Sequence, residues 1–288
     1  MSGTLITAHL TQYALIEVAG EDAEKYLQGQ LTCDVTKLPV GQSTLTANCD
    51  PKGKVVSLFR LIRVKETVFY LLMRKHFVEN GLANLKKYAV FSKVTFTPIE
   101  KVWLVGVAND DTLYSDYFSV QYAPNRRIII DTEQSNALGW AIELGDIGVA
   151  QEWDRLEIQD GIPVLAQQAF EFIPQALNLQ HIEQAISFQK GCYIGQETVA
   201  RAKYRGANKR AMYTLIGKTE TMPTIGSELE MLLETNWRKT GSIISAVSMD
   251  GVLYVQAVLS NQLEASTQFR LPDDHTALCI QPLSYVLD

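Results

Sequence analysis

The sequence lacks paired cysteines and long apolar runs. Its four cysteines, Cys33, Cys49, Cys192 and Cys279, are widely separated and form no CxxC pair. This spacing argues against a disulfide framework and against a zinc or iron–sulfur site held by the chain alone, so we expect a reduced, cytoplasmic setting and no bound metal. No apolar run approaches the roughly 18 residues of a membrane span, and the first residues carry no basic leader. We therefore expect neither export nor membrane insertion.

The motifs of the common enzyme classes are absent as well. The sequence contains no GxGxxG, GxxxxGK[ST], HExxH or GxSxG. Its four histidines, His9, His76, His181 and His275, are isolated, and each is more typical of a surface or capped histidine than of a base or a metal ligand. No conventional catalytic constellation is predicted.

The charges are unevenly distributed along the chain, although the formal net charge is only −6. Residues 52–93 contain ten lysines and arginines against two acidic residues, and residues 190–210 contain six against one, which leaves ten against 29 elsewhere. This asymmetry indicates two basic surfaces that face a polyanion. Solvated helix and strand faces explain the same charges, because the sequence does not show whether they share a face.

What is present is typical of a soluble globular protein of two or three domains: 288 residues, 47% of them hydrophobic and 20% charged. In the first half, apolar periodicity predicts helices at 21–32, 74–90 and 148–161, the last closed by Gly161 and Pro163, and strands at 13–18, 43–50, 55–64, 67–73, 92–98, 101–108 and 138–144. This order favours an α+β, ferredoxin-like layer. The signal over 111–135 is weaker, and no edges are placed there.

From residue 211 onward the chain consists of short apolar runs separated by turn signals. The runs lie at 211–217, 227–233, 240–248, 252–260, 267–271 and 276–283. They predict an all-β C-terminal domain, most simply a small barrel.

The stretch FQKGCYIGQETVARAKYRGANKR, residues 188–210, places Cys192 between two glycines, Gly191 and Gly195. If QETVARAKY is helical, Cys192 lies just before its N-terminus, where backbone amides and Lys190 would favour the thiolate. Glycines also let the backbone approach a ligand closely. A reactive thiol is therefore plausible, although a free cysteine more often behaves as a small buried hydrophobe.

The residues after Cys192 are polar and then basic. Gln196 and Glu197 can supply hydrogen bonds to a bound polar ring, but Glu197 equally suits the first turn of a helix. The basic residues are Arg201, Lys203, Arg205, Lys209 and Arg210, with Tyr204 and Asn208 among them. Such a mixture suits contact with phosphates and stacking on a flat ring, and a solvated helix end explains it almost as well.

The segment KGCYIGQE, residues 190–197, with the VARAKYRGANKR that follows the next threonine, resembles the signature of the YgfZ family of folate-binding proteins, relatives of the glycine-cleavage aminomethyltransferases. Six other segments resemble the same family in the same order: EKYLQGQLTCDV, CDPKGK, LKKYAVFSKV, FIPQALNLQ, NWRKTG and IQPLSYVLD. The resemblance therefore covers nearly the whole chain. Ile194, where threonine is common, is a β-branched replacement.

The resemblance implies a three-domain, aminomethyltransferase-like α+β fold around a central channel. The implied domains are a discontinuous folate-binding α+β domain at 1–46 and 147–206, a ferredoxin-like α+β domain at 47–146, and a β-barrel domain at 207–288. The implied ligand is tetrahydrofolate or a related reduced folate. Paired aromatic contacts to it map onto Tyr13, where tryptophan is common, and Trp153. Cys192 is the implied functional thiol, within a motif that also contains Lys190, Gly191, Tyr193, Gly195, Gln196 and Glu197.

The function implied by the resemblance is that of an accessory protein in the assembly or repair of iron–sulfur enzymes that thiolate transfer RNA. Those enzymes are its expected clients, and direct contact with tRNA is a further expectation. Ser57-Leu58 stand where the aminomethyltransferases have an aspartate, so we do not expect glycine-cleavage chemistry. Two alternatives stay open. A folate-dependent one-carbon transferase that uses Cys192 predicts turnover of a folate adduct, and a tRNA-binding module without folate predicts a strongly salt-dependent affinity.

Overall fold

A computed structural model of the chain describes residues 5–109, 117–132, 139, 148–167 and 171–287. The chain divides into two compact units. Unit 1 comprises Met1–Pro51, Val56–Trp153 and Glu183–Ile194, and unit 2 comprises Lys52–Val55, Asp154–Ile182 and Gly195–Asp288. The division falls inside the KGCYIGQE motif, between Ile194 and Gly195. The three-domain boundaries stay a prediction.

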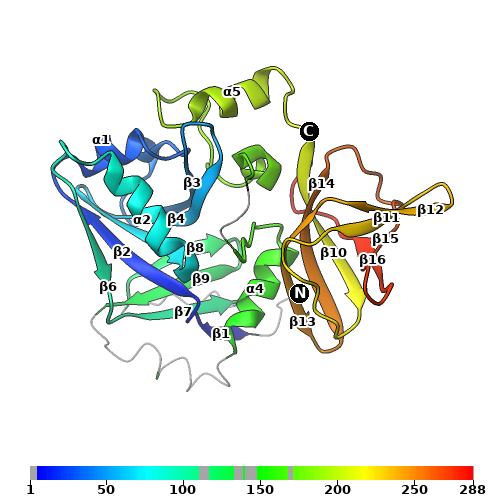
Figure 1. The fold of residues 1–288 in the computed structure, drawn as a ribbon. Coiled ribbons are helices and arrows are strands. Elements are labelled where there is room, and N and C mark those ends of the chain that lie inside the picture. Colours follow the sequence, from blue (N-terminus) through cyan, green and yellow to red (C-terminus); the bar gives the residue numbers. More distant parts are fainter. Residues whose placement is uncertain (1–4, 110–116, 133–138, 140–147, 168–170, 288) are drawn as a thin grey trace. The chain divides into compact units, whose positions relative to one another are not determined.

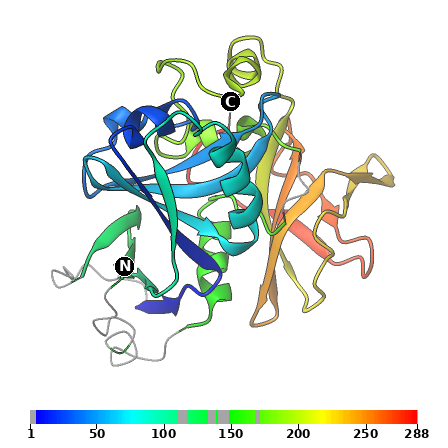
Figure 2. The ribbon, with the colours of Figure 1, turned by 60° about the vertical axis from the view of Figure 1, so that its left-hand side comes forward.

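Unit 1 contains a five-stranded sheet with the order β3-β4-β5-β2-β6. The strands of this sheet and the helices between them are β2 (Tyr13–Ala19), α1 (Ala23–Gln28), η1 (Val35–Lys37), β3 (Ser43–Cys49), β4 (Val55–Lys65), β5 (Val68–Arg74), η2 (Lys75–Phe77), α2 (Val78–Lys87) and β6 (Thr95–Ile99). Helices α1 and α2 lie together on one face of this sheet (Figures 1 and 2). The Tyr26 hydroxyl of α1 donates to the Leu85 carbonyl of α2, and Gly81 of α2 lies against Ser57 of β4.

A second, antiparallel sheet of unit 1 has the order β1-β7-β9-β8. Its strands are β1 (Ile6–His9), β7 (Trp103–Ala108), β8 (Ser119–Ala123) and β9 (Arg126–Asp131), and helix α4 (Ala150–Gln159) begins in the same unit. Trp153 of α4 is fully buried and packs against Gly106 of β7, because a Cβ built on Gly106 would lie 2.5 Å from two carbons of its ring. Glycine is therefore the residue that lets the indole approach this strand.

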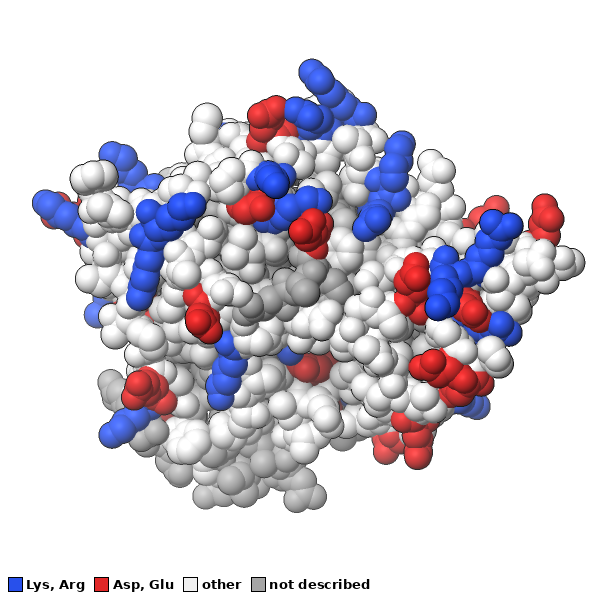
Figure 3. Space-filling view, in the orientation of Figure 1, with Lys and Arg blue, Asp and Glu red and all other residues white. Residues whose placement is uncertain are grey.

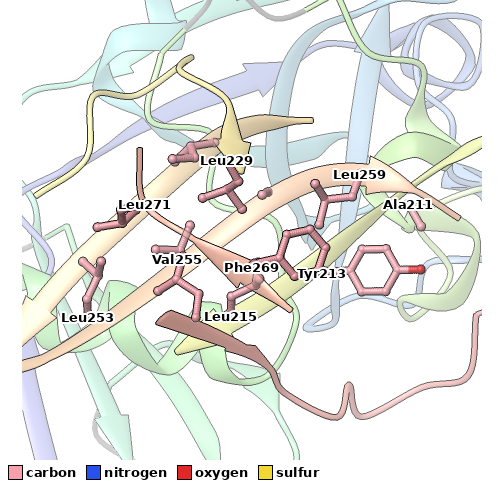
Figure 4. Close-up of a cluster of buried hydrophobic side chains, with 12 residues drawn as sticks. Ala211, Tyr213, Leu215, Leu229, Leu253, Val255, Leu259, Phe269 and Leu271 are labelled. Carbon is pink, nitrogen blue, oxygen red and sulfur yellow. The ribbon is translucent and has the colours of Figure 1, made fainter. Parts of the chain in front are cut away.

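Unit 2 contains a seven-stranded sheet with the order β12-β11-β15-β16-β10-β14-β13. Its elements are η3 (Pro174–Leu177), η4 (Leu179–His181), α5 (Gln196–Tyr204), β10 (Arg210–Lys218), β11 (Leu229–Leu233), β12 (Asn236–Thr240), β13 (Ser242–Met249), β14 (Val252–Ser260), β15 (Phe269–Arg270) and β16 (Ala277–Ile280). Side chains from most of these strands meet in one buried cluster that includes Tyr213, Val255 and Phe269 (Figure 4). This cluster is the hydrophobic core of the C-terminal sheet.

The patterns predicted the element types well. The expected helices at 21–32, 74–90 and 148–161 contain α1, α2 and α4, and α4 ends at Gln159, just before Gly161 with its positive φ of 71°. The unplaced segment 111–135 contains β8 and β9, and β12 forms within NWRKTG, where no strand was predicted. Apart from Gly139, the expected strand at 138–144 lies outside the described residues. The mixed helix and sheet content and the C-terminal β region are confirmed.

Three of the ten cations in the first basic segment, 52–93, do not contribute to a surface, because Arg60, Arg63 and Arg74 are buried. Six others are exposed: Lys52, Lys65, Lys75, Lys86, Lys87 and Lys93. Inward positions of β4 and β5 carry guanidiniums instead of apolar groups. Among the described residues, no helix is long and apolar enough to cross a membrane.

We predict that Gly106→Ala lowers the free energy of unfolding by about 1–3 kcal/mol, because the added methyl overpacks the site of Trp153. Gly191→Ala is the matched control: a Cβ at Gly191 meets no atom within 4 Å, so its effect should stay within about 0.5 kcal/mol. Urea unfolding followed by tryptophan fluorescence measures both. Equal stability of the two variants would show that Gly106 is not needed for the approach of the indole.

Candidate functional site

The segment that carries Cys192 is tied to unit 1 on both sides of the cysteine. Before it, the Lys190 ammonium donates to the carbonyls of Leu31 and Cys33, at 2.7 Å each. After it, the Ile194 amide donates to the Gly29 carbonyl at 3.2 Å. Cys192 lies between these anchors and is exposed. The arrangement presents one thiol to solvent from a segment whose two ends are fixed.

Lys190 acts differently from the prediction that it supports a thiolate at Cys192. Its ammonium is buried, contacts two carbonyls that follow α1, and lies 4.9 Å from the centre of the Tyr193 ring. Burial lowers the pKa of Lys190 to about 8, although Cys33 and Asp34 act in the opposite direction. Burial likewise raises the pKa of Tyr193. Lys190 and Tyr193 are thus the buried side of the segment.

The second half of the motif begins helix α5 in unit 2. Gly195 is its N-cap residue with a φ of 83°, a left-handed conformation that favours glycine. Glu197 is exposed and pairs with Arg201 one turn later, at 2.5 Å. Gln196 is half-buried. The prediction that Cys192 lies just before a helix N-terminus is confirmed, whereas Gly191 has no unusual φ and open space around it.

The four cysteines fall into two classes. Cys33 and Cys49 are buried, and Cys192 and Cys279 are exposed. Burial raises the pKa of Cys33 to about 11, and burial followed by the charge of Asp50 raises that of Cys49. The buried pair is therefore protected from reagents at neutral pH.

The two predicted folate contacts, Tyr13 and Trp153, belong to one buried group of side chains in unit 1. We call this group the arginine–aromatic cluster; its members are Tyr13, Arg60, Arg74, Tyr122, Arg126 and Trp153. The Tyr13 and Tyr122 hydroxyl oxygens are 3.5 Å apart, and the Tyr122 and Trp153 rings meet edge to face at 5.3 Å. Tyr122 thus connects the two residues that sequence reasoning had paired.

The arginines of the cluster lie over its aromatic rings. Arg60 is 4.1 Å from the centre of the Tyr122 ring, and Arg74 is 5.0 Å from that of Tyr13. Arg126 is 5.3 Å from the Tyr122 ring and 5.0 Å from the Trp153 ring. These distances are within the range of cation–π attraction. Sequence reasoning missed the three arginines and Tyr122; the one available signal was arginine at inward-facing positions of predicted strands.

The structure also limits what Trp153 can do. Its side chain is fully buried, with Gly106 and Arg126 against it, and its indole nitrogen has no hydrogen-bond partner among the described residues. A ligand can stack on this ring only after a covering side chain moves. Tyr13 also lines a pocket of about 330 Å³ whose walls include Leu15, Ile99 and Lys75. Its contact with a ligand stays a prediction, as does that of Trp153.

The predicted basic residues Arg201, Lys203, Arg205, Lys209 and Arg210 are all exposed in unit 2. They follow one another along α5 and into the start of β10. Among the residues that the structure describes, no group of three or more histidine, cysteine or acidic side chains is placed to hold a metal ion.

Comparisons with known proteins agree with this architecture. Residues 6–108 match the GCVT N-terminal domain, and residues 208–274 match the YgfZ beta-barrel domain. The solved glycine cleavage system aminomethyltransferase T from Bartonella henselae superposes with a TM-score of 0.68 at 17% identity, covering 98% of this chain and 86% of that one. The chain thus has the fold of the glycine-cleavage aminomethyltransferases.

Sequence relatives identify the family within that fold class. The tRNA-modifying protein YgfZ of Escherichia coli O157:H7 is 41% identical over 310 residues, covering 99% of this chain and 94% of that protein. An uncharacterised protein of Haemophilus influenzae is 52% identical over 264 residues, covering 91% of each. The chain belongs to the YgfZ family.

We predict that Lys190 contributes more stability at alkaline pH. Its pKa is about 8 in the folded chain against 10.5 for an ordinary lysine, so between these values the unfolded chain binds more protons and stability rises with pH. Relative to Lys190→Met, the unfolding free energy of the unmodified protein should rise by about 1–2 kcal/mol from about pH 7.5 to about pH 9.5. Urea unfolding of both proteins at the two pH values tests this; a pH-independent difference contradicts it.

We predict that alkylation at neutral pH modifies Cys192 first. Cys33 and Cys49 should react only after unfolding because they are buried, and Cys279 is the matched exposed control. Peptide mapping after limited labelling with iodoacetamide gives the order of reaction. Faster labelling of Cys279 would show that the motif does not activate Cys192.

Proposed function

We propose that this protein is a folate-binding accessory protein that supports assembly or repair of iron–sulfur clusters in client enzymes, and thereby tRNA methylthiolation, with Cys192 as its functional thiol. The observation that carries the proposal is the exposed Cys192 on a segment anchored by Lys190 and Ile194. The relation to a tRNA-modifying protein makes tRNA modification the process concerned. An exposed thiol fits a role in handing over or protecting a cluster that the chain does not hold permanently.

The chemistry of the arginine–aromatic cluster fits a folate. A folate has flat rings and an anionic tail, which suit aromatic side chains beside guanidiniums. Tyr13 belongs to this cluster and also lines the pocket of about 330 Å³, whose lining includes one lysine, Lys75, and one acid, Glu100. Pockets of this size hold part of a ligand as large as a folate. We propose that the ring system of the folate lies beside Tyr13 and that its anionic tail is directed toward cationic side chains.

The presence of Ser57 favours folate binding without turnover over one-carbon transfer. The side chain at this position is fully buried in unit 1, and its hydroxyl has no hydrogen-bond partner among the described residues. A serine hydroxyl does not accept a proton or stabilise a cation at neutral pH as a carboxylate does. This observation supports an accessory role, and turnover of a folate adduct by the purified protein would instead favour the transferase.

The proposal is tested with Cys192→Ala, using Cys279→Ala as the matched exposed control. Each variant loses one sulfur atom at an exposed position, so folding should survive. In a strain that lacks the gene, Cys192→Ala should fail to restore methylthio-nucleosides in tRNA, whereas Cys279→Ala should restore them fully. Mass spectrometry of hydrolysed tRNA measures the outcome.

Folate binding is measured on the same purified variants by calorimetry with tetrahydrofolate. Cys192→Ala should bind as the unmodified protein does, and Tyr13→Leu should bind at least about 5-fold more weakly because a ring contact is lost. Full restoration of methylthiolation by Cys192→Ala would overturn the assignment of the thiol. Unchanged binding by Tyr13→Leu would remove Tyr13 from the site.

A further inference from the structure

The charges after Cys192 lie on an element whose inner face is fixed in unit 2. Helix α5 buries Val199 and Ala202, and the Gln175 side-chain amide donates to the Val199 carbonyl at 2.6 Å. Arg201, Lys203 and Tyr204 of the helix, and Arg205 at its C-cap, are all exposed. The helix therefore presents its cations and one aromatic ring to solvent, while Val199 and Ala202 are buried in unit 2.

The segment after α5 continues the row of cations with a fixed backbone. The Lys209 carbonyl accepts from the Asn261 amide at 3.0 Å, and Arg210 begins β10 opposite Ser260 of β14. The Asn208 side chain accepts from the Arg210 amide and donates to its carbonyl, at 3.2 and 2.7 Å. Lys209 and Arg210 are thus held by sheet and turn hydrogen bonds.

A distant part of the sequence joins this face. The PKGK turn contributes Lys52–Val55 to unit 2, and its Gly53, with a φ of 76°, lies so close to α5 that a Cβ there would be 2.6 Å from the Thr198 Cβ. The Val55 amide donates to the Phe172 carbonyl at 2.8 Å, which fixes the turn from its other end. Lys52 is exposed on this turn. One member of the first basic segment of the sequence therefore lies beside the second.

We call the combined face the α5 basic surface; its residues are Lys52, Arg201, Lys203, Tyr204, Arg205, Lys209 and Arg210. In Figure 3, lysine and arginine side chains gather over α5 and the chain that follows it. Between Gly195 and Arg210, five basic residues stand against one acid, Glu197, which pairs with Arg201. Cations at a helix C-terminus are stabilised by the helix dipole, but this effect does not account for Lys52, Lys209 and Arg210, which lie on other elements.

Tyr204 distinguishes an RNA partner from a simple anion. Its side chain is 68% exposed among the cations, so the ring is accessible to a flat partner group. Cations that contact phosphates and an aromatic ring on which an unpaired base stacks are the usual elements of RNA recognition. A polyglutamate tail or an acidic protein surface uses the cations but has no base for the ring.

We propose that the α5 basic surface binds the sugar–phosphate backbone of tRNA, with Tyr204 stacked on an unpaired base. This inference rests on the proposed role in tRNA modification and identifies the surface that contacts the RNA.

The test is fluorescence anisotropy of a labelled tRNA transcript with the full-length protein. Arg205→Gln with Lys209→Gln should weaken binding about 10-fold or more at low salt, and should reduce the slope of log K against log salt by about 1.5 to 2. Tyr204→Ala should weaken binding about 5-fold or more with an unchanged salt slope. The matched control is Arg238→Gln with Lys239→Gln, an exposed basic pair on β12 of the same unit, which should change affinity less than 2-fold.

Three outcomes overturn the inference: no tRNA binding by the unmodified protein, equal losses in the surface and control variants, or loss of polyglutamyl folate binding in calorimetry while tRNA binding is unchanged. The last result would assign the surface to the folate tail. Each can occur while Cys192→Ala still abolishes methylthiolation, so failure of this inference is distinguishable from failure of the proposed function. Loss of tRNA affinity with unchanged folate affinity supports the inference.

Discussion

The ion pair between the buried Arg60 and the partly exposed Glu183 is the interaction on which the rest of unit 1 depends. The Arg60 guanidinium donates to both carboxylate oxygens, at 2.7 and 3.2 Å, and to the Tyr122 carbonyl at 3.1 Å. The carboxylate also accepts from the Leu45 amide at 3.0 Å. Burial alone would lower the pKa of Arg60, but Glu183 outweighs it and the pKa is raised, so the guanidinium stays charged inside the fold. Removal of Glu183 would leave the buried Arg60 guanidinium without its counter-charge and would therefore destabilise unit 1. The pair thereby joins β4, β8 and the beginning of the segment that carries Cys192.

The Arg60 guanidinium belongs both to the ion pair with Glu183 and to the arginine–aromatic cluster. Arg60 lies over the Tyr122 ring, at the centre of the arginine–aromatic cluster, and Glu183 already occupies two of its donors. An anionic ligand in the cluster would therefore compete with Glu183 for Arg60. Arg74 and Arg126 lie over the rings of Tyr13 and Trp153. Under the proposed folate binding, the charge of Arg60 stabilises the ion pair before it attracts a ligand.

Sequence patterns predicted the elements better than the sites. Helical periodicity located α1, α2 and α4, because each carries a local apolar stripe or a glycine stop. The patterns failed at β12, whose NWRKT is polar and forms a strand by pairing with β11. The site could be found only in part. Cys192 was visible from its flanking residues, but the burial of Arg60 and Arg74 depends on which face of β4 and β5 meets the other sheet. Charge counts do not contain that information, so two of the arginines counted toward a basic surface, Arg60 and Arg74, lie in a buried cluster.

The division between Ile194 and Gly195 gives the two halves of KGCYIGQE different physical tasks. In the first half, Lys190 and Ile194 bind carbonyls near the end of α1, and the cysteine is exposed between them. In the second half, Gly195 adopts the left-handed conformation that begins α5, and Glu197 pairs with Arg201 in its first turns. The spacing inside the motif follows from these tasks. A residue inserted between Lys190 and Ile194 would lengthen the exposed tip, whereas one inserted after Gly195 would rotate Val199 and Ala202 out of the interior of unit 2, because successive helical residues are about 100° apart. The compactness of the motif therefore reflects two compact units, each of which fixes one half of it.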